Sequence, residues 1–487
     1  MTEPEKLPPG VLPTRPVLGG FHPDPTVCRV DDVFYLACSS FEYAPGIPLF
    51  RSSDLLTWER IGSVMDRPSQ LELSDAAPSG GVYAPTLRHH DGTFFLVTTN
   101  VSDGPGHLLM TATDPAGAWS DPVRVRGAGG VDPDIAWDED GRCLLTWADG
   151  GIRQAPLDPG TGDLLSEPRP LWSGTGGRDP EAPHLYRVGR WWYLVIAEGG
   201  TGAGHAATVA RAPSPTGPFE PCPHQPLLTA RGGPGPVQNT GHADLVERPD
   251  GSWAMVFLGV RPSGSFPGWH VLGRETFAAE VAWRDGWPVV AGPVEPEETP
   301  AVRTPLGDGV IGADWVGAGV FPERVLRWSR GRWRMSARGA EPVFVGHRQE
   351  HTTMTVRAGI DAHEGTGALE VRVDPVHRFA LEVDGARVSA VARVGPLTTV
   401  LGEAPATADT VLELRVVRPT APEHSRERGP DVVVAAVRTP ERTVELARMD
   451  GRYLSTETAG GFTGRMVGVS CASGEIDVRF VEYLGGA

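Results

Sequence analysis

The chain has 487 residues, of which 40% are hydrophobic and 22% are charged, a composition typical of globular proteins with a large core. Its formal net charge of −17 argues against nucleic acid and anionic membranes as partners, because both attract basic surfaces. The 62 glycines and 47 prolines show no collagen period and indicate many turns between short strands.

Nothing in the sequence predicts secretion or membrane insertion. The N-terminal segment MTEPEKLPPGVLPTRP lacks the apolar core of a signal peptide. The run WWYLVIA at 191–197 is far shorter than the roughly 20 residues that cross a bilayer. The five cysteines show no CxxC spacing, and although Cys28 and Cys38 could pair across a hairpin, we favour buried free thiols. We therefore expect a cytoplasmic protein that does not bind a membrane.

Five segments of the first three hundred residues share one layout: a polar or small residue, an aliphatic residue, a tight turn and an aromatic-aliphatic run. Several of the turns are Asp-Gly, which is a strong hairpin signal because it tolerates positive φ. The segments recur at intervals of 48 to 60 residues, a period that fits the blades of a propeller. They are DPTVCRVDDVFYLAC from 24, APTLRHHDGTFFLVT from 84, DPDIAWDEDGRCLLTWA from 132, EAPHLYRVGRWWYLVIA from 181 and HADLVERPDGSWAMVFL from 242.

These five units predict an all-β fold whose first domain, residues 15–297, is a five-bladed β-propeller. The outer strand is least apparent in the third unit. Residues 291–305 are rich in Pro and Glu and are interpreted as a linker. The remainder shows apolar residues at every second position and no helical periodicity, which predicts a concanavalin-like β-sandwich over residues 304–487.

The residues that open the five units are candidates for chemistry, because the first strand of each blade lines the central channel. They are Asp24, Ala84, Asp132, Glu181 and His242. Three carboxyl groups from three blades would meet at one channel mouth and drive their pKa values apart. Hydrolysis of a glycosidic bond needs such an acid and base. A single Asp-Pro is more often a turn, so the hypothesis depends on the phasing with the repeat, from which Glu181 departs by one residue.

Several motifs together resemble glycoside hydrolase family 43, in its β-xylosidase and α-L-arabinofuranosidase branch with a C-terminal sandwich. They include GFHPDP (20–25), SSFEYAPG (39–46), VDPDIAWDEDGR (131–142), DPEAPHLY (179–186), TGHADLV (240–246) and LGRETF (272–277). The resemblance covers nearly the whole chain. It implies inverting hydrolysis in which Asp24 activates water as general base, Glu181 is the general acid, and Asp132 orients that acid and tunes its pKa. Ala182 stands where the family usually has glycine.

The same resemblance implies further pocket residues. Arg274 would reach the hydroxyl groups of the substrate, although an interblade salt bridge is the simpler interpretation. Phe41 and Tyr83 would form an apolar wall for a sugar ring, against the alternative that they belong to the core. His242 would lie near a calcium or sodium ion in the propeller channel, contacting it through water. A buried histidine without metal is an equal alternative, and the chemistry requires no cofactor.

The sequence therefore predicts an exo-acting, inverting glycosidase that releases terminal pentoses, α-L-arabinofuranose and/or β-D-xylose, from xylan- or arabinan-derived oligosaccharides. Three motifs in the middle of the propeller sequence slightly favour arabinofuranose: GGVYAPT (80–86), VTTN (97–100) and GTGGRDPEAPHLY (174–186). The expected partner is a small oligosaccharide, and the chain is a candidate homo-oligomer. The competing hypothesis is a non-catalytic carbohydrate-binding propeller, which would gain nothing from crowded anions.

Overall fold

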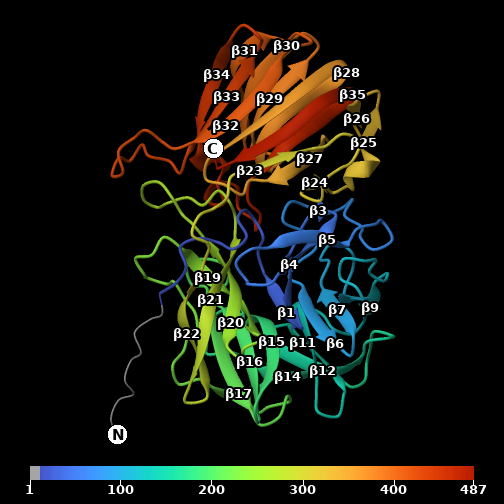
Figure 1. Cartoon of the computed structure of the whole chain (residues 1–487), viewed down its shortest axis with the longest axis vertical. Coiled ribbons are helices and arrows are strands. Elements are labelled where there is room, and N and C mark those ends of the chain that lie inside the picture. Colours follow the sequence, from blue (N-terminus) through green and yellow to red (C-terminus); the bar gives the residue numbers. More distant parts are fainter. Residues whose placement is uncertain (1–10, 340, 487) are drawn as a thin grey trace.

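The computed structural model describes residues 11–339 and 341–486 and consists of two β-rich parts stacked along the long axis (Figure 1). The lower part holds the first three hundred residues and the upper part the rest. Most of the N-terminal segment considered for a signal peptide lies outside the described residues. No described helix is long and apolar enough to cross a membrane.

Five antiparallel sheets form the lower part, and they follow one another along the chain as the blades of a propeller. Four have four strands, and the third has two short outer strands instead of one, in agreement with the weak repeat there. The strands are β1 (Thr26–Val30), β2 (Val33–Ala37), β4 (Gly46–Ser52) and β5 (Glu59–Met65); β6 (Thr86–His90), β7 (Thr93–Thr98), β8 (His107–Ala112) and β9 (Val123–Val125); β10 (Val131–Trp137), β11 (Cys143–Ala148), β12 (Ile152–Asp158), β13 (Asp163–Leu164) and β14 (Arg169–Trp172); β15 (Glu181–Val188), β16 (Trp191–Glu198), β17 (Ala206–Ala212) and β18 (Glu220–Pro221); β19 (Gln238–Glu247), β20 (Trp253–Val260), β21 (Glu275–Arg284) and β22 (Trp287–Val294).

The repeated aliphatic residue of each unit explains why the ring closes. Val27, Leu87, Ile135, Leu185 and Leu245 are at most 4% exposed, and each belongs to a different apolar cluster. Each cluster lies between two neighbouring blades, and the one that contains Val27 joins the fifth blade to the first. Burying one aliphatic side chain stabilises the fold by about 1.5–3 kcal/mol, so the repeat supplies a similar contribution at every junction.

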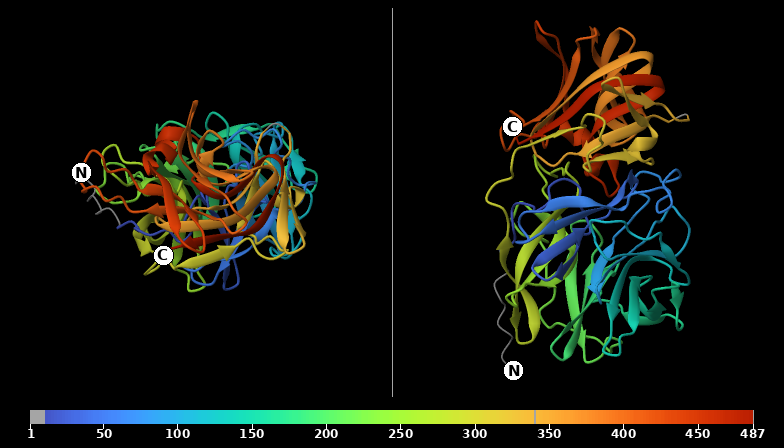
Figure 2. Two further views of the ribbon diagram at one scale, coloured as in Figure 1. Left: turned by 90° about the horizontal axis from the view of Figure 1, so that it is seen from above. Right: turned by 45° about the vertical axis from the view of Figure 1, so that its right-hand side comes forward.

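The upper part is built on two long, strongly bent strands, β28 and β35, which pair along most of their length (Figure 2). A fourteen-stranded sheet forms around them and folds over one apolar core, an arrangement that fits a sandwich. Its strands are β3 (Tyr43–Ala44), β23 (Val302–Pro305), β24 (Trp315–Ala318), β25 (Leu326–Ser329), β26 (Arg332–Ser336), β27 (Val343–Arg348), β28 (Met354–Asp374), β29 (His377–Asp384), β30 (Arg387–Val394), β31 (Leu397–Pro405), β32 (Val411–Val417), β33 (Val432–Arg438), β34 (Thr443–Asp450) and β35 (Met466–Gly485).

The segment expected as a linker differs from the sequence-based expectation. It contains the end of β22 and all of β23, which pairs with β35, so only residues 295–301 lie between strands. The prediction of free thiols is confirmed, because all five cysteines are buried and unpaired. The one α-helix among the described residues is the four-residue α1 (Thr456–Ala459).

The first blade contributes directly to the upper part. Strand β3 leaves the propeller and pairs with β24, with Ala44 opposite Gly317 and Tyr43 opposite Ala318. An apolar cluster that includes Phe21 and Phe344 covers this junction. Segments of the upper part are thereby fixed close to the face of the propeller on which its inner strands begin.

Candidate active site

A cavity of about 270 Å³ opens at the face of the propeller where the inner strands begin, and it is lined by all eight candidate residues from the sequence. Those residues are Asp24, Phe41, Tyr83, Ala84, Asp132, Glu181, His242 and Arg274. The other lining residues are Val131, Arg178, Asp179, Gly200, Thr201 and Phe462. The repeat therefore brings together side chains that are up to 250 residues apart in sequence, as in the hydrogen-bonded pair Asp24 and Arg274.

A repeated backbone conformation aims these side chains at the channel mouth. Asp24, Asp132, Ala182 and His242 occupy the same position in their units, three residues before the buried aliphatic residue, and all have φ between 50° and 56°. In the third, fourth and fifth blades this position coincides with an irregularity in the pairing of the first two strands. In the fourth blade Ala182 takes the left-handed position, so the acidic residue before it, Glu181, approaches from a different backbone position.

Asp24 is buried and held in its ionised form. Its Oδ1 accepts a hydrogen bond from Arg274 Nη1 at 2.8 Å, and its Oδ2 accepts one from Ser39 Oγ at 2.6 Å. Burial alone would raise the pKa of Asp24, but Arg274, His242 and the Ser39 hydroxyl together lower it below its ordinary value. A carboxylate that stays ionised at neutral pH is suited to accept a proton.

Glu181 has the opposite environment. Burial and then the negative charge of Asp132 raise the pKa of Glu181 to about 8, against smaller opposing effects of His242 and Arg274. Its carboxyl group therefore carries a proton at neutral pH. Asp24 and Glu181 thus supply one ionised and one protonated carboxyl group in the same pocket, the pair that general acid and base catalysis requires.

His242 and Asp132 connect these two groups. His242 Nε2 lies 3.7 Å from Asp132 Oδ2 and 3.9 Å from Asp24 Oδ1. Although burial lowers the pKa of His242, the two carboxylates raise it to about 9, so the ring is an imidazolium at neutral pH. Asp132 Oδ2 also accepts a hydrogen bond from the Ala182 backbone N–H at 3.2 Å, which ties the third blade to the fourth directly beside Glu181.

Three aromatic rings form one wall, and one of them comes from the upper part of the molecule. Phe41 packs edge-on against Tyr83 and is stacked on Phe462, with ring centroids 5.5 and 6.1 Å apart. The Arg274 guanidinium lies over the faces of Phe41 and Phe462 and donates from Nε to the Phe462 carbonyl at 3.4 Å. Phe462 N–H in turn donates to Ser79 Oγ at 2.9 Å. A loop of the second part therefore closes one side of the pocket.

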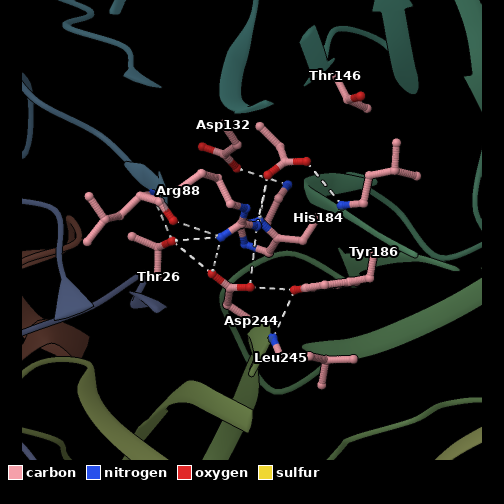
Figure 3. Close-up of polar contacts among 12 residues, drawn as sticks. Thr26, Arg88, Asp132, Thr146, His184, Tyr186, Asp244 and Leu245 are labelled. Carbon is pink, nitrogen blue, oxygen red and sulfur yellow. Dashed lines mark hydrogen bonds and ion pairs between the residues drawn. The ribbon is translucent and has the colours of Figure 1, made fainter. Parts of the chain in front are cut away.

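Below the pocket, the guanidinium of Arg88 lies in the centre of the channel (Figure 3). It donates to Asp134 Oδ1 and Asp244 Oδ2, both at 2.9 Å, and lies 3.0 Å from His184 Nδ1. Asp244 also accepts from the Thr26 hydroxyl at 2.8 Å. Inner strands of all five blades thus meet at one largely buried cation and its two carboxylates, which fix the position of the channel mouth above them.

The channel residues offer few direct ligands for a calcium or sodium ion, and an ion contacted through water stays a prediction. Their two buried carboxylates are directed at Arg88, and His242 is itself positively charged between Asp24 and Asp132. Among residues 11–339 and 341–486, no group of three or more His, Cys, Asp or Glu side chains is arranged to hold a metal ion. No step of the chemistry is therefore derived through a metal.

The family model described as "Glycosyl hydrolases family 43" matches residues 13–288. Over 93% of this chain and 90% of the relative, the sequence is 35% identical to "Non-reducing end alpha-L-arabinofuranosidase BoGH43B" of Bacteroides ovatus. The chain belongs to glycosyl hydrolase family 43. A "Xylosidase/arabinosidase" of Butyrivibrio fibrisolvens is 45% identical over 58% of this chain and 56% of the relative.

Solved structures of family 43 proteins share both parts of the fold. The Bacteroides ovatus protein "Xyloglucan PUL GH43B" superposes with a TM-score of 0.85 at 32% identity, covering 96% of this chain and 99% of the other. A xylan beta-1,4-xylosidase from Bacillus halodurans C-125 gives a TM-score of 0.84 at 27% identity, with coverage of 96% and 99%. This family 43 protein is therefore a glycosidase, and the enzyme hypothesis stands over the non-catalytic alternative.

Several pocket residues of this family 43 enzyme were not among the candidates from the sequence. Arg178, Asp179 and Thr201 lie in loops around the fourth blade, outside the repeated motifs. Thr201 accepts a hydrogen bond from Arg274 Nη1 at 3.2 Å. Phe462 lies in the segment GGFTGRMVGV (460–469), far from the propeller in sequence, so the repeat gave no signal for its place in the pocket.

Proposed function

We propose that this enzyme is an exo-acting, inverting glycosidase that releases a terminal pentose from short oligosaccharides. The observation that supports it best is the single pocket in which an ionised Asp24 and a protonated Glu181 face the same space of about 270 Å³. That volume is near the lower end of the roughly 300–1,000 Å³ of small-molecule sites, as expected for one monosaccharide.

The proposed reaction is a single displacement. Asp24 removes a proton from a water molecule, whose oxygen attacks the anomeric carbon. As the bond from that carbon to the glycosidic oxygen breaks, Glu181 donates its proton to the leaving oxygen. Asp132 keeps the pKa of Glu181 high through its negative charge, and His242 holds Asp132 and Asp24 in place.

Recognition of the sugar falls to the remaining pocket residues. Arg274 is fixed by Asp24, Thr201 and Phe462, and we assign its guanidinium to hydroxyl groups of the terminal sugar. Phe41, Tyr83 and Phe462 supply the apolar wall for the ring. Closure of the pocket by Phe462 supports attack at a chain end, because a continuing chain could not pass through that wall.

For the substrate we propose α-L-arabinofuranosides and β-D-xylosides, with a slight preference for the former. The Bacteroides relative, which matches over 93% of this chain, bears the name of an arabinofuranosidase, and the Butyrivibrio relative bears both names. Comparison of kcat/KM on the aryl α-L-arabinofuranoside and the aryl β-D-xylopyranoside measures the preference. Activity on neither would contradict the pentosidase proposal. NMR detection of the first-formed anomer tests inversion.

Leaving-group chemistry separates the two catalytic roles. Glu181→Gln should lower kcat on oligosaccharides by about 10²–10⁴-fold but much less on a dinitrophenyl glycoside, whose leaving group needs no proton. Asp24→Asn should lose activity on both, because water still needs a base. Glu139→Gln, an exposed surface change, is the matched control. Equal losses on both substrates for Glu181→Gln would contradict its assignment as the acid.

Three further expectations belong to the same proposal. The chemistry should need no metal, so dialysis against EDTA should leave kcat/KM unchanged. A cytoplasmic location would be checked by fractionation of the source cells.

For a homo-oligomer, we propose that the subunits contact one another through the edge strand β31, where Leu397, Val400 and Leu401 are 72%, 54% and 45% exposed. Light scattering should then show a smaller mass for Val400→Lys than for the parent protein.

A further inference from the structure

A second cavity, of about 620 Å³, lies between two loops of the second blade and is separate from the reaction pocket. Its walls are residues 103–106, between β7 and β8, and residues 126–129, between β9 and β10, together with Arg124. Both loops project from the end of the propeller at which the reaction pocket opens, because 126–129 leads directly into the inner strand β10.

This groove adjoins the reaction pocket. Gly129 lines the groove, and two residues later Val131 lines the pocket, which places their Cα atoms within about 7 Å. The opposite wall is also connected to the pocket. Tyr83 N–H donates to the Thr99 carbonyl at 2.9 Å, at the start of the segment that leads to 103–106. Both walls of the groove are therefore continuous in the chain with segments of the reaction pocket.

The groove carries one guanidinium without a counter-charge. Arg124 is neutralised by Asp103, with Nη2 and Oδ2 at 2.7 Å, and its Nη1 donates to the Pro105 carbonyl at 3.3 Å. Arg126 is exposed and makes no hydrogen bond or ion pair with any residue of 11–339 or 341–486. In a chain of net charge −17, such a free cation beside a substrate pocket is a distinctive feature.

The rest of the lining indicates the kind of ligand. The remaining groove residues are glycine, alanine and proline, so a sugar ring finds no aromatic platform there. Only glycine fits at position 106, because a Cβ on this residue would clash with the Val125 carbonyl oxygen in the wall of the groove. Recognition must then come from charge and hydrogen bonds, and a guanidinium binds a carboxylate through two parallel N–H donors.

We propose that this groove binds a uronic acid unit carried by the leaving part of the oligosaccharide, with Arg126 receiving its carboxylate. The inference rests on the proposed function, since it concerns the portion of the substrate beyond the cleaved bond. It makes the enzyme selective for acidic over neutral oligosaccharides with the same terminal pentose.

The test compares two oligosaccharides with the same terminal pentose, one neutral and one bearing glucuronic acid on the sugar next to it. Arg126→Gln should lower kcat/KM for the acidic substrate by about tenfold, through loss of a charge-assisted contact, and leave the neutral substrate unchanged. Arg126→Lys should restore part of the loss. Arg142→Gln, at an exposed turn between β10 and β11, is the matched control. The difference in kcat/KM between Arg126→Gln and the parent enzyme on the acidic substrate should become smaller at high salt.

Equal effects of Arg126→Gln on both substrates, or no effect on either, would overturn the inference. Absence of turnover on the neutral substrate would instead contradict the proposed function. Calorimetry with Glu181→Gln protein measures binding without turnover, so it tests the role of the groove independently of the proposed function. There, the acidic oligosaccharide should bind tighter than the neutral one, and adding Arg126→Gln should abolish the difference.

Discussion

Asp24 and Arg274 form a buried ion pair, with 2.8 Å between Oδ1 and Nη1, and the same guanidinium is stacked against Phe462 of the second part of the chain. The proposed base is therefore held ionised by the residue assigned to substrate hydroxyls. Both the charge of the base and the position of the sugar depend on a contact with the C-terminal part, so the two parts form one functional unit.

The pH dependence of kcat/KM should follow the two carboxyl groups. Glu181 is active when protonated, and its pKa is raised to about 8, so activity should fall above about pH 8. Asp24 is active when ionised, and its pKa lies below its ordinary value, so activity should persist well into the acidic range. A dinitrophenyl glycoside should weaken the alkaline decline. A decline that begins near pH 5 would contradict the protonated Glu181.

Asp132→Asn should move the alkaline limit to lower pH. After burial, the charge of Asp132 is the largest cause of the raised Glu181 pKa, and asparagine removes that charge while retaining an acceptor for the Ala182 N–H. The pH profile of kcat/KM on an oligosaccharide measures the shift. An unchanged limit with merely reduced activity would indicate that Asp132 only shapes the site.

Phe462→Ala should raise KM for oligosaccharides, with a drop in kcat/KM of about tenfold, because both the apolar wall and the stacking of Arg274 are lost. Ser79→Ala, which removes only the acceptor for Phe462 N–H, should have a smaller effect. Phe480→Ala, on β35, controls for loss of an aromatic ring from the second part. A loss confined to kcat would argue against a binding wall.

The propeller and its three carboxyl groups were predictable because both follow a local repeat. Each copy places an aliphatic residue at a blade junction, and the first, third and fifth copies place a polar residue three positions earlier, at the channel mouth. In the fourth copy Glu181 lies four positions earlier. Phe462 was not predictable in this way, because its position depends on how the second part docks through β3 and β24. The role of Arg88 as a cation of the channel was also not predictable, because Arg88 is not among the residues to which the resemblance assigns a function.

Ala182→Gly should be neutral or stabilising. Ala182 has φ 50°, a conformation that costs an alanine about 1–2 kcal/mol but costs glycine almost nothing. The gain offsets the loss of the buried methyl group and the greater freedom of the unfolded chain. Ala197→Gly, an equally buried position in β16 that is not left-handed, should instead lower the free energy of unfolding by about 1 kcal/mol. Denaturant unfolding of both variants decides the comparison.

Arg88→Met should lower the free energy of unfolding by about 3–5 kcal/mol, because it leaves Asp134 and Asp244 buried without their cation. Arg51→Met, which breaks an exposed pair with Glu59, should cost about 0–1 kcal/mol.

Acidic pH should reduce the difference in the free energy of unfolding between Arg88→Met and the parent protein. Burial would raise the pKa of Asp244, but Arg88 and its neighbours lower it to about 2. The stabilisation that this pair contributes is therefore present above the ordinary carboxyl pKa and disappears as the pH falls through about 2. Denaturant unfolding at neutral pH and near pH 3 measures both effects. A deficit that does not depend on pH would mean that Arg88 stabilises the channel by packing and not by charge.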